Sequence, residues 1–224
     1  KMDNIFGTLI AKFLMKTMGI NKMNSHYALC HKEYGRDFTS AVLKAYNVNY
    51  EVDREQLDKL PKEGPFIIVS NHPFGGWDGI VLFDAISSVR PDFKIITNFL
   101  LSYIPNLKEH FLSVNPFSEN KALSSSISGI KNAKSVLDNG GVLGIFPAGE
   151  VATYYGKKYP ADKSWKQTIM KLILGSNVPI VPVYFDGTNS RWFHFVGKIH
   201  PMLRTVNLIN ELNKRESGTI TLKI

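Results

Sequence analysis

From about residue 66 onward, short apolar runs alternate with longer segments whose apolar positions recur every three to four residues. The short runs predict strands buried on both faces, and the longer segments predict helices packed against them. The predicted strands cover residues 66–70, 93–97, 111–114, 142–146, 178–185 and 219–224, and the predicted helices cover residues 76–89, 122–137, 164–174 and 203–213. Strands separated by helices require right-handed crossovers, so we expect an α/β fold with a largely parallel central sheet flanked by helices.

The first part of the chain has a different pattern. Apolar pairs recur about every four residues from Ile5 to Met18, which predicts an amphipathic helix with Lys12 and Lys16 off its apolar stripe or at its edge. Such a helix can lie in a membrane interface or pack on the core, and the pattern favours neither. A second helix is predicted over residues 25–45. We therefore expect an N-terminal amphipathic helical segment over residues 1–47, with possible membrane-surface docking, and an α/β domain over residues 48–224.

Chemistry-bearing residues follow the first predicted strand of the sheet, in the run Asn71-His72-Pro73-Phe74-Gly75-Gly76-Trp77-Asp78-Gly79. In sheets of this kind, ligands bind at the carboxyl ends of the strands. The glycines let the backbone turn sharply, so His72 and Asp78 can approach each other. An aspartate that accepts the ring N–H leaves the other ring nitrogen free as a general base. The alternative is that His72 packs or caps and that Asp78 only begins a helix.

Two other predicted strands also end in unusual segments. The run Phe146-Pro147-Ala148-Gly149-Glu150 is restrained by Pro147 and Gly149, and Glu150 could meet a substrate cation or hydroxyl, or be an ordinary loop glutamate. The strand at residues 178–185 contains two prolines, which remove ladder donors, so we expect it at an edge of the sheet or locally irregular.

Asn98 and Arg191 follow predicted strands and fall on the same edge of the predicted sheet. Asn98 is a candidate for holding the site, and Arg191 is a candidate for binding an acidic group.

Composition narrows the class of protein further. The chain has 224 residues, 44% of them hydrophobic and 21% charged, which is typical of a globular protein. Its one cysteine, Cys30, excludes an internal disulfide and a cysteine-based zinc site. Its apolar runs are shorter than the roughly 20 residues that span a bilayer. The net charge of +8 could serve nucleic acid, anionic lipid or acidic partners, or be only a solvated surface. Without a basic cluster or a known module, we expect no nucleic-acid partner.

Three of these segments, in this order, resemble the motifs of the lysophospholipid (glycerolipid) acyltransferase family: Asn71-His72 with Asp78, then Phe146-Pro147-x-Gly149, then Val178-Pro179-Ile180-Val181-Pro182. With Trp165-Lys166 and Asn189-Ser190, the chain is most similar to the hemolysin-like bacterial branch, which includes enzymes that acylate ornithine and glycine lipids. The similarity covers about residues 66–224.

The sequence departs from the family pattern at two places. Five residues separate His72 from Asp78 where the family commonly has four, and the Gly75-Gly76 pair can absorb the extra residue. Ala148 and Val151 stand where the family commonly has the Glu and Arg that contact a glycerol phosphate. We therefore expect a different head group on the acceptor, such as that of a zwitterionic amino-acid lipid.

The resemblance implies transfer of a fatty acyl chain from a thioester, on acyl carrier protein or coenzyme A, to a lysophospholipid or amino-acid-lipid acceptor. It makes His72 the general base and Asp78 its orienting partner, with no cofactor and no metal. The expected substrate-binding residues are Gly75, Gly76, Asn98, Pro147, Gly149, Glu150 and Arg191. A thioester or ester hydrolase and a non-catalytic lipid-binding protein of the membrane surface are the alternatives.

The basic charge suits an acidic carrier protein and an anionic membrane surface. We therefore expect the protein in the cytoplasm, peripherally bound to the inner face of the cytoplasmic membrane.

Overall fold

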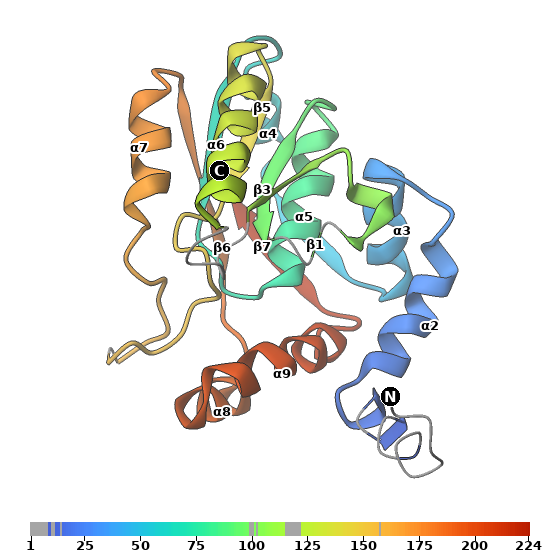
Figure 1. Ribbon diagram of the computed structural model, residues 1–224. Coiled ribbons are helices and arrows are strands. Elements are labelled where there is room, and N and C mark those ends of the chain that lie inside the picture. Colours follow the sequence, from blue (N-terminus) through green and yellow to red (C-terminus); the bar gives the residue numbers. More distant parts are fainter. Residues whose placement is uncertain are drawn as a thin grey trace.

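A single sheet with helices on both faces forms the centre of the protein in the computed structural model (Figure 1). The structure describes residues 9, 12, 13, 15–98, 101, 103–114, 122–156 and 158–224. Within these residues the sheet has seven strands in the order β1-β7-β6-β2-β5-β3-β4. The strands are β1 (Asn49–Val52), β2 (Phe66–Ser70), β3 (Lys94–Asn98), β4 (Phe111–Val114), β5 (Val142–Ile145), β6 (Ile180–Asp186) and β7 (Thr219–Lys223). Neighbouring strands are parallel except β6 and β7, so the predicted α/β fold with a largely parallel sheet is confirmed.

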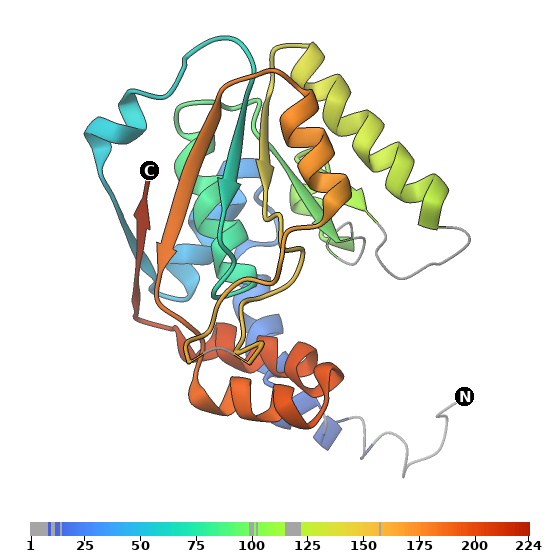
Figure 2. The same ribbon diagram turned by 90° about the vertical axis from the view of Figure 1, so that its left-hand side faces the viewer.

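The helices around the sheet are α2 (Ile20–Cys30), α3 (Gly35–Ala45), α4 (Arg54–Asp58), α5 (Gly76–Ser87), α6 (Ala122–Asp138), α7 (Gln167–Gly175), α8 (Arg191–Ile199) and α9 (Pro201–Lys214), with a short 3₁₀ turn at Pro105–Leu107. Figure 2 shows α6 and α7 on one face of the sheet and α5 on the other. Helices α8 and α9 lie across the end of the sheet toward which β6 points, which is also where β2 and β5 end.

Strand β2 separates two apolar cores because successive side chains of a strand point to opposite faces. Phe66 and Ile68 belong to the larger core, which side chains of α3 and α5 complete. Ile67 and Val69 belong to the smaller core, which side chains of α6 and α7 complete. All five residues of β2 are buried, as the uninterrupted apolar run predicted.

The helix predicted over residues 25–45 is wrong in one respect, because the chain forms two helices there. Helix α2 ends at Cys30 and α3 begins at Gly35, whose φ of 54° lies in the left-handed region. Asn106 stabilises the break, since its side-chain amide donates to the carbonyls of His31 and Glu33. Side chains of α3 pack in the same core as the sheet.

Half of the predicted N-terminal amphipathic helix, including residues 5–8, lies outside the described residues. Of its apolar positions, Leu9 and Phe13 are described as helical and exposed. No helix among the described residues is long and apolar enough to cross a bilayer.

The two prolines near β6 do not place it at an edge, which corrects one half of that expectation. Pro179 precedes the strand, and Pro182 lies opposite Val69 of β2. In a parallel ladder alternate N–H groups point to opposite sides, and the bond from Ile67 N–H to the Pro179 carbonyl sets the nitrogen of Pro182 away from β2. Strand β7 pairs only with Tyr184–Asp186. The nitrogen of Pro182 therefore faces the side of β6 on which no strand pairs with it, so the missing N–H removes no hydrogen bond of the sheet.

Candidate active site

His72 and Asp78 come together in the turn between β2 and α5. His72 Nδ1 lies 2.9 Å from Asp78 Oδ2. The Asp78 side chain is fully buried, whereas the His72 side chain is 19% exposed. The pair is close enough for a hydrogen bond, but the ring N–H is not aligned with the oxygen in this conformation. The pair has the geometry in which a carboxylate orients a histidine whose Nε2 stays available to a substrate.

The turn holds Asp78 rigidly. Asp78 is in the first turn of α5, and its Oδ2 accepts the backbone N–H groups of Phe74 and Gly75 at 2.8 and 2.9 Å. These bonds satisfy donors that the helix itself leaves unpaired, and an acid is favourable at a helix N-terminus. Because the Gly75 amide is bound to Asp78, it is not available to stabilise an oxyanion in this conformation.

Gly75 supplies the bend that brings the two side chains together. Its φ is 81° and its ψ is −117°, a backbone conformation that L residues rarely adopt. A Cβ at this position would lie 3.0 Å from Leu208 of α9, and one at Gly76 would lie 3.2 Å from Leu212. Helix α9 therefore packs directly on the glycine turn.

The segment between β5 and α7 holds His72 in place. The His72 ring stacks on Phe146, with the centroids 4.3 Å apart. The His72 carbonyl accepts the N–H of Ala152 at 2.9 Å, and its own N–H donates to Asp162 Oδ1 at 3.2 Å. The sequence analysis missed Asp162, because nothing near it in the sequence marks it and it lies 90 positions from His72.

Asp162 and Arg215 add charges near His72 and Asp78, which we call the dyad. Burial raises the pKa of Asp162, and the charge of Asp78 adds to this effect, while the backbone N–H and charge of His72 oppose it. Arg215 lies over the Phe74 ring, with Cζ 3.5 Å from the centroid, and donates to the Thr188 carbonyl. Burial lowers the pKa of Arg215, and the charge of Asp78 opposes that shift.

Pro147 and Gly149 shape the turn after β5. The Gly149 N–H donates to the Phe146 carbonyl, and the Lys166 N–H donates to the Pro147 carbonyl. Gly149 has a φ of 70°, and a Cβ there would lie 2.8 Å from the Lys166 side chain. The turn therefore favours glycine for its backbone, whereas the end of the flexible Lys166 side chain could move away from a Cβ.

Glu150 lies in a charged cluster with residues from two other segments. Its carboxylate contacts Arg204 at 2.8 Å and Lys163 at 3.1 Å. Burial raises the pKa of Glu150, but hydrogen bonds from Tyr155, Lys163 and Arg204 outweigh burial and leave the pKa below its ordinary value. The loop after β5 is thereby tied to α9, which also packs on the glycine turn.

Comparison with known proteins decides the family. A family model for acyltransferases matches residues 4–213, which is most of the chain.

The chain belongs to the acyltransferase family.

Two curated relatives and one solved structure are similar to this acyltransferase. Lyso-glycine lipid O-acyltransferase from Phocaeicola vulgatus is 25% identical over 222 residues, covering 96% of this chain and 77% of the relative. Its counterpart of the same name from Bacteroides thetaiotaomicron is 25% identical over 220 residues, covering 95% and 78%. The structure of the 1-acyl-sn-glycerophosphate acyltransferase PlsC from Thermotoga maritima matches with a TM-score of 0.53 at 18% identity, covering 96% of this chain and 76% of PlsC.

Two predicted site residues of the acyltransferase, Asn98 and Arg191, are not part of the turn that holds His72 and Asp78. Asn98 ends β3, which β5 separates from β2, and its side chain is exposed. Arg191 is the first residue of α8 rather than part of a loop, and it is also exposed.

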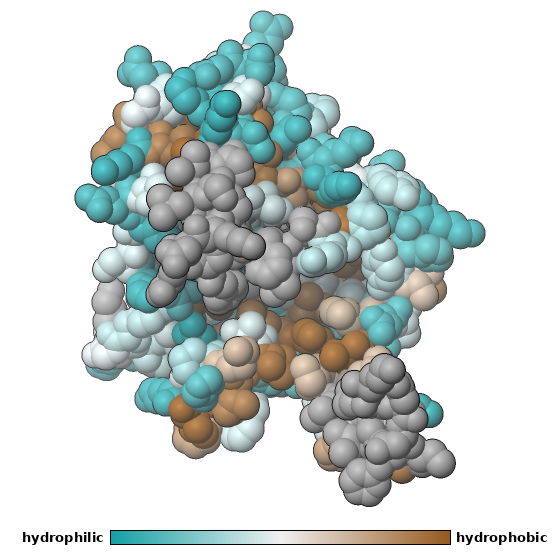
Figure 3. Space-filling model, viewed as in Figure 1, coloured by the Kyte–Doolittle hydropathy of each residue, from teal (hydrophilic) through white to brown (hydrophobic). Residues whose placement is uncertain are grey.

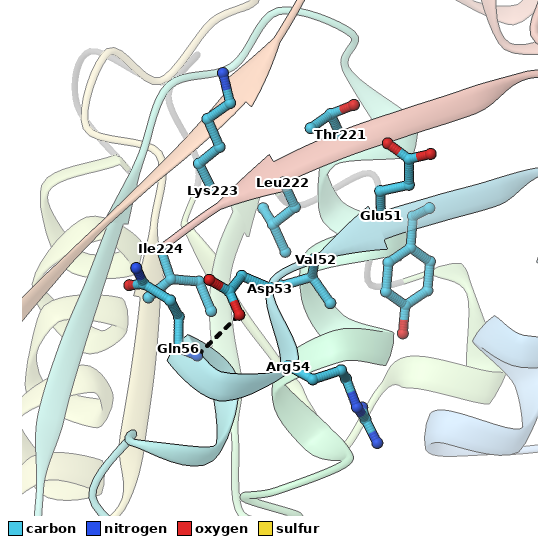
Figure 4. Close-up of a pocket in the computed structure, with 10 residues that line it drawn as sticks. Glu51, Val52, Asp53, Arg54, Gln56, Thr221, Leu222, Lys223 and Ile224 are labelled. Carbon is cyan, nitrogen blue, oxygen red and sulfur yellow. Dashed lines mark hydrogen bonds between the residues drawn. The ribbon is translucent and has the colours of Figure 1, made fainter.

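A pocket of about 840 Å³ lies away from the dyad, where β1 and β7 end side by side (Figure 4). Arg54, Gln56 and Lys223 are among the residues that line it, and neither His72 nor Asp78 is one of them. This pocket is therefore separate from the dyad of His72 and Asp78.

Proposed function

We propose that this acyltransferase moves a fatty acyl chain from a thioester, on acyl carrier protein or coenzyme A, to the hydroxyl of a single-chain amino-acid lipid. The observation that carries the proposal is the close contact between His72 and the buried carboxylate of Asp78 at the carboxyl end of β2. The names of the two relatives support a lipid acceptor and an ester product.

The proposed reaction needs only proton transfer and positioning. His72 Nε2 takes the proton of the acceptor hydroxyl as its oxygen attacks the thioester carbonyl carbon. The tetrahedral intermediate then collapses, its C–S bond breaks, and the leaving thiolate takes the proton from the imidazolium. Asp78 holds the ring in the productive tautomer and stabilises the imidazolium. No covalent acyl-enzyme forms.

The acceptor head group follows from the side chains after β5. Ala148 and Val151 are 1% and 7% exposed and carry no charge, so this pair of positions offers no ligand to a glycerol phosphate. Nearby Glu150, Lys163 and Arg204 supply both signs of charge, and the two cations suit the carboxylate of an amino-acid head group. In this proposal Glu150 belongs to the acceptor site, and Pro147 and Gly149 shape it.

The protein would act at the inner face of the cytoplasmic membrane. Its acceptor is a lipid held in the bilayer, and each basic side chain near an anionic leaflet contributes about 1 kcal/mol to attraction. The net charge of +8 also favours an acidic carrier protein as the donor.

The test is a transfer assay with an acyl thioester and a lyso-glycine lipid in detergent, with the product identified by mass spectrometry. His72→Ala should lower the rate about 10²–10⁴-fold, the usual contribution of a positioned general base. His31→Ala, which changes an exposed histidine at the end of α2, should retain the wild-type rate.

A wild-type rate in His72→Ala would contradict the mechanism. Acyl release that is unaffected by the acceptor would instead make the protein a thioester or ester hydrolase.

A further inference from the structure

Helix α8 is apolar on two sides, although only one of them is buried. Phe193 and Val196 face the protein and are 0% and 8% exposed. Trp192, Phe195 and Ile199 are 56%, 53% and 63% exposed. Their spacing of three and four positions places them on one stripe of the helix, and the Trp192 and Phe195 rings stack with centroids 5.7 Å apart. The apolar arc of the helix is therefore wider than its buried side, and part of it is left uncovered by the protein.

The first turn of α9 extends this surface. Met202 and Leu203 are 63% and 46% exposed, which is unusual for large apolar side chains that follow one another. We call Trp192, Phe195, Ile199, Met202 and Leu203 the α8 patch. Figure 3 shows apolar colour at the lower left, where Figure 1 places α8. Exposed apolar surface gathered in one place marks an interaction site.

The charged residues that α8 and the first half of α9 contribute are all positive, and one of them, Arg204, pairs with Glu150. Arg191 and Lys198 are seven positions apart and lie together along one edge of the exposed stripe. No acidic residue occurs from residue 191 to residue 210. The next one, Glu211, is 4% exposed and is held by Ser190 and Lys214.

A basic pocket of about 420 Å³ adjoins the patch at Trp192. Lys16, Lys22 and Lys214 line it, and of these Lys22 pairs with Glu216 and Lys214 with Glu211. Asn207 also lines it, is 8% exposed, and has a side-chain N–H group that no described residue accepts. The Lys16 ammonium and the unpaired Asn207 amide donor together favour an anionic group as the occupant.

We propose that the α8 patch docks the protein on an anionic lipid bilayer, with a lipid head group entering the lysine-lined pocket. Aromatic residues beside basic ones suit the interface between head groups and acyl chains. This inference rests on the proposed function, because a lipid acceptor has to be reached in a bilayer. Helix α9 packs on the glycine turn through Leu208 and Leu212. Docking through the α8 patch therefore brings the membrane to the end of the sheet that carries His72 and Asp78.

The experiment is co-sedimentation of the full chain with vesicles of phosphatidylcholine alone or mixed equally with phosphatidylglycerol. The wild type should bind the mixed vesicles more tightly, and added salt should weaken binding. W192S combined with F195S should lower partitioning about tenfold or more, since both side chains lose their burial in lipid. The matched control is L174S, at a side chain of α7 that is 71% exposed on another part of the molecule.

A second set of binding measurements tests the basic residues with two double variants that change the net charge equally. R191E with K198E should lower binding to the mixed vesicles about tenfold or more. K62E with K171E should change it little, because Lys62 precedes β2 at the opposite end of the sheet and Lys171 lies on α7. In a W165F background, a blue shift of fluorescence on binding should report Trp192, because Trp77 is fully buried.

Unchanged partitioning of W192S/F195S would overturn the docking proposal. It would also be overturned by a dimer in solution that these substitutions dissociate, since a second copy would then cover the patch.

Failure of the proposed function has a different signature. A wild type that binds vesicles but transfers no acyl chain refutes the reaction, whereas one that acylates a short-chain acceptor in solution but binds no vesicles refutes docking.

Discussion

At the scale of single residues, the site combines a local motif with distant supports. His72, Gly75 and Asp78 lie within one turn, so their meeting could be predicted from a histidine, a flexible glycine pair and an aspartate. Asp162 and Arg215 could not be predicted, because a contact between distant residues leaves no pattern in a single sequence. Glu150 was predicted as a site residue, but its ion pairs with Lys163 and Arg204 arise only from the tertiary fold.

The buried carboxylate of Asp78 and the half-buried carboxylate of Asp162 should respond differently to the same substitution. Asp78→Asn should lower the transfer rate about 10²-fold or more, because an amide cannot stabilise the imidazolium. Asp162→Asn is the matched change, and its amide oxygen can still accept the His72 N–H. It should keep the rate within about threefold and leave the unfolding free energy equal or higher, since no buried charge is formed. Equal losses of rate in the two variants would contradict the assignment.

Gly75 should be the least replaceable residue of the turn. Gly75→Ala should lower the free energy of unfolding by about 1–3 kcal/mol, because alanine strains the backbone there and its Cβ meets Leu208. Gly79→Ala is the control, since this glycine lies within α5 and a Cβ there meets nothing within 4 Å. It should stabilise the protein by up to about 1 kcal/mol. Chemical denaturation measures both values, and equal effects would contradict the strain argument.

At the scale of elements, strands with a clear apolar run were predictable, and short elements without one were not. An uninterrupted apolar run marked β2 and β5, which are buried throughout. Strand β1 was missed because it has four residues, alternates between exposed and half-buried positions, and contains no apolar run. Helix α8 was missed although its apolar positions follow a helical period, because it has only nine residues. The break between α2 and α3 depends on Asn106, which is remote in the sequence.

The start of α8 depends on a buried glutamate of α9. Glu211 accepts Ser190 N–H at 2.8 Å, Ser190 Oγ at 2.7 Å and Lys214 Nζ at 2.6 Å. Burial raises the pKa of Glu211, but these three bonds outweigh burial and leave the pKa below its ordinary value. Ionised Glu211 therefore stabilises the fold at pH values above the ordinary glutamate pKa of about 4.3.

Glu211→Gln should lower the free energy of unfolding by about 1–3 kcal/mol at neutral pH. The difference from wild type should shrink as the pH falls from about 4.3 through the lower pKa of folded Glu211, because protonation removes the same charge. Denaturation curves at several pH values measure it. Glu55→Gln, at an exposed residue paired with Lys59, should cost less than about 0.5 kcal/mol. A difference that grows toward acid would contradict this account.

At the scale of the whole molecule, Asp84 binds the N-terminal helices to the sheet. This residue of α5 is 4% exposed and accepts hydrogen bonds from Thr39, Ser40 and Tyr50. Burial, followed by the charge of Asp84, raises the pKa of Tyr50. Because α3 also contributes to the larger core, we expect the described part of residues 1–47 from α2 onward to unfold together with the sheet.

Thermal unfolding should therefore show one transition for the full chain. Asp84→Ala should lower the free energy of unfolding by at least about 2 kcal/mol, because three hydroxyl groups lose their acceptor. Asp58→Ala, at an exposed residue of α4, should change it by less than about 0.5 kcal/mol. A separate early transition for α2 and α3, seen as loss of amide protection in those helices alone, would contradict the prediction.

The position of β1 in the sheet also constrains how the protein is made. Strand β1 joins the sheet only through β7, although about 170 residues of sequence separate Asn49 from Thr219. A chain emerging from the ribosome therefore carries β1 without its partner until residues 219–223 have been synthesised. Slow translation of the segment before residue 219 should lengthen the time during which this edge is open to other nascent chains.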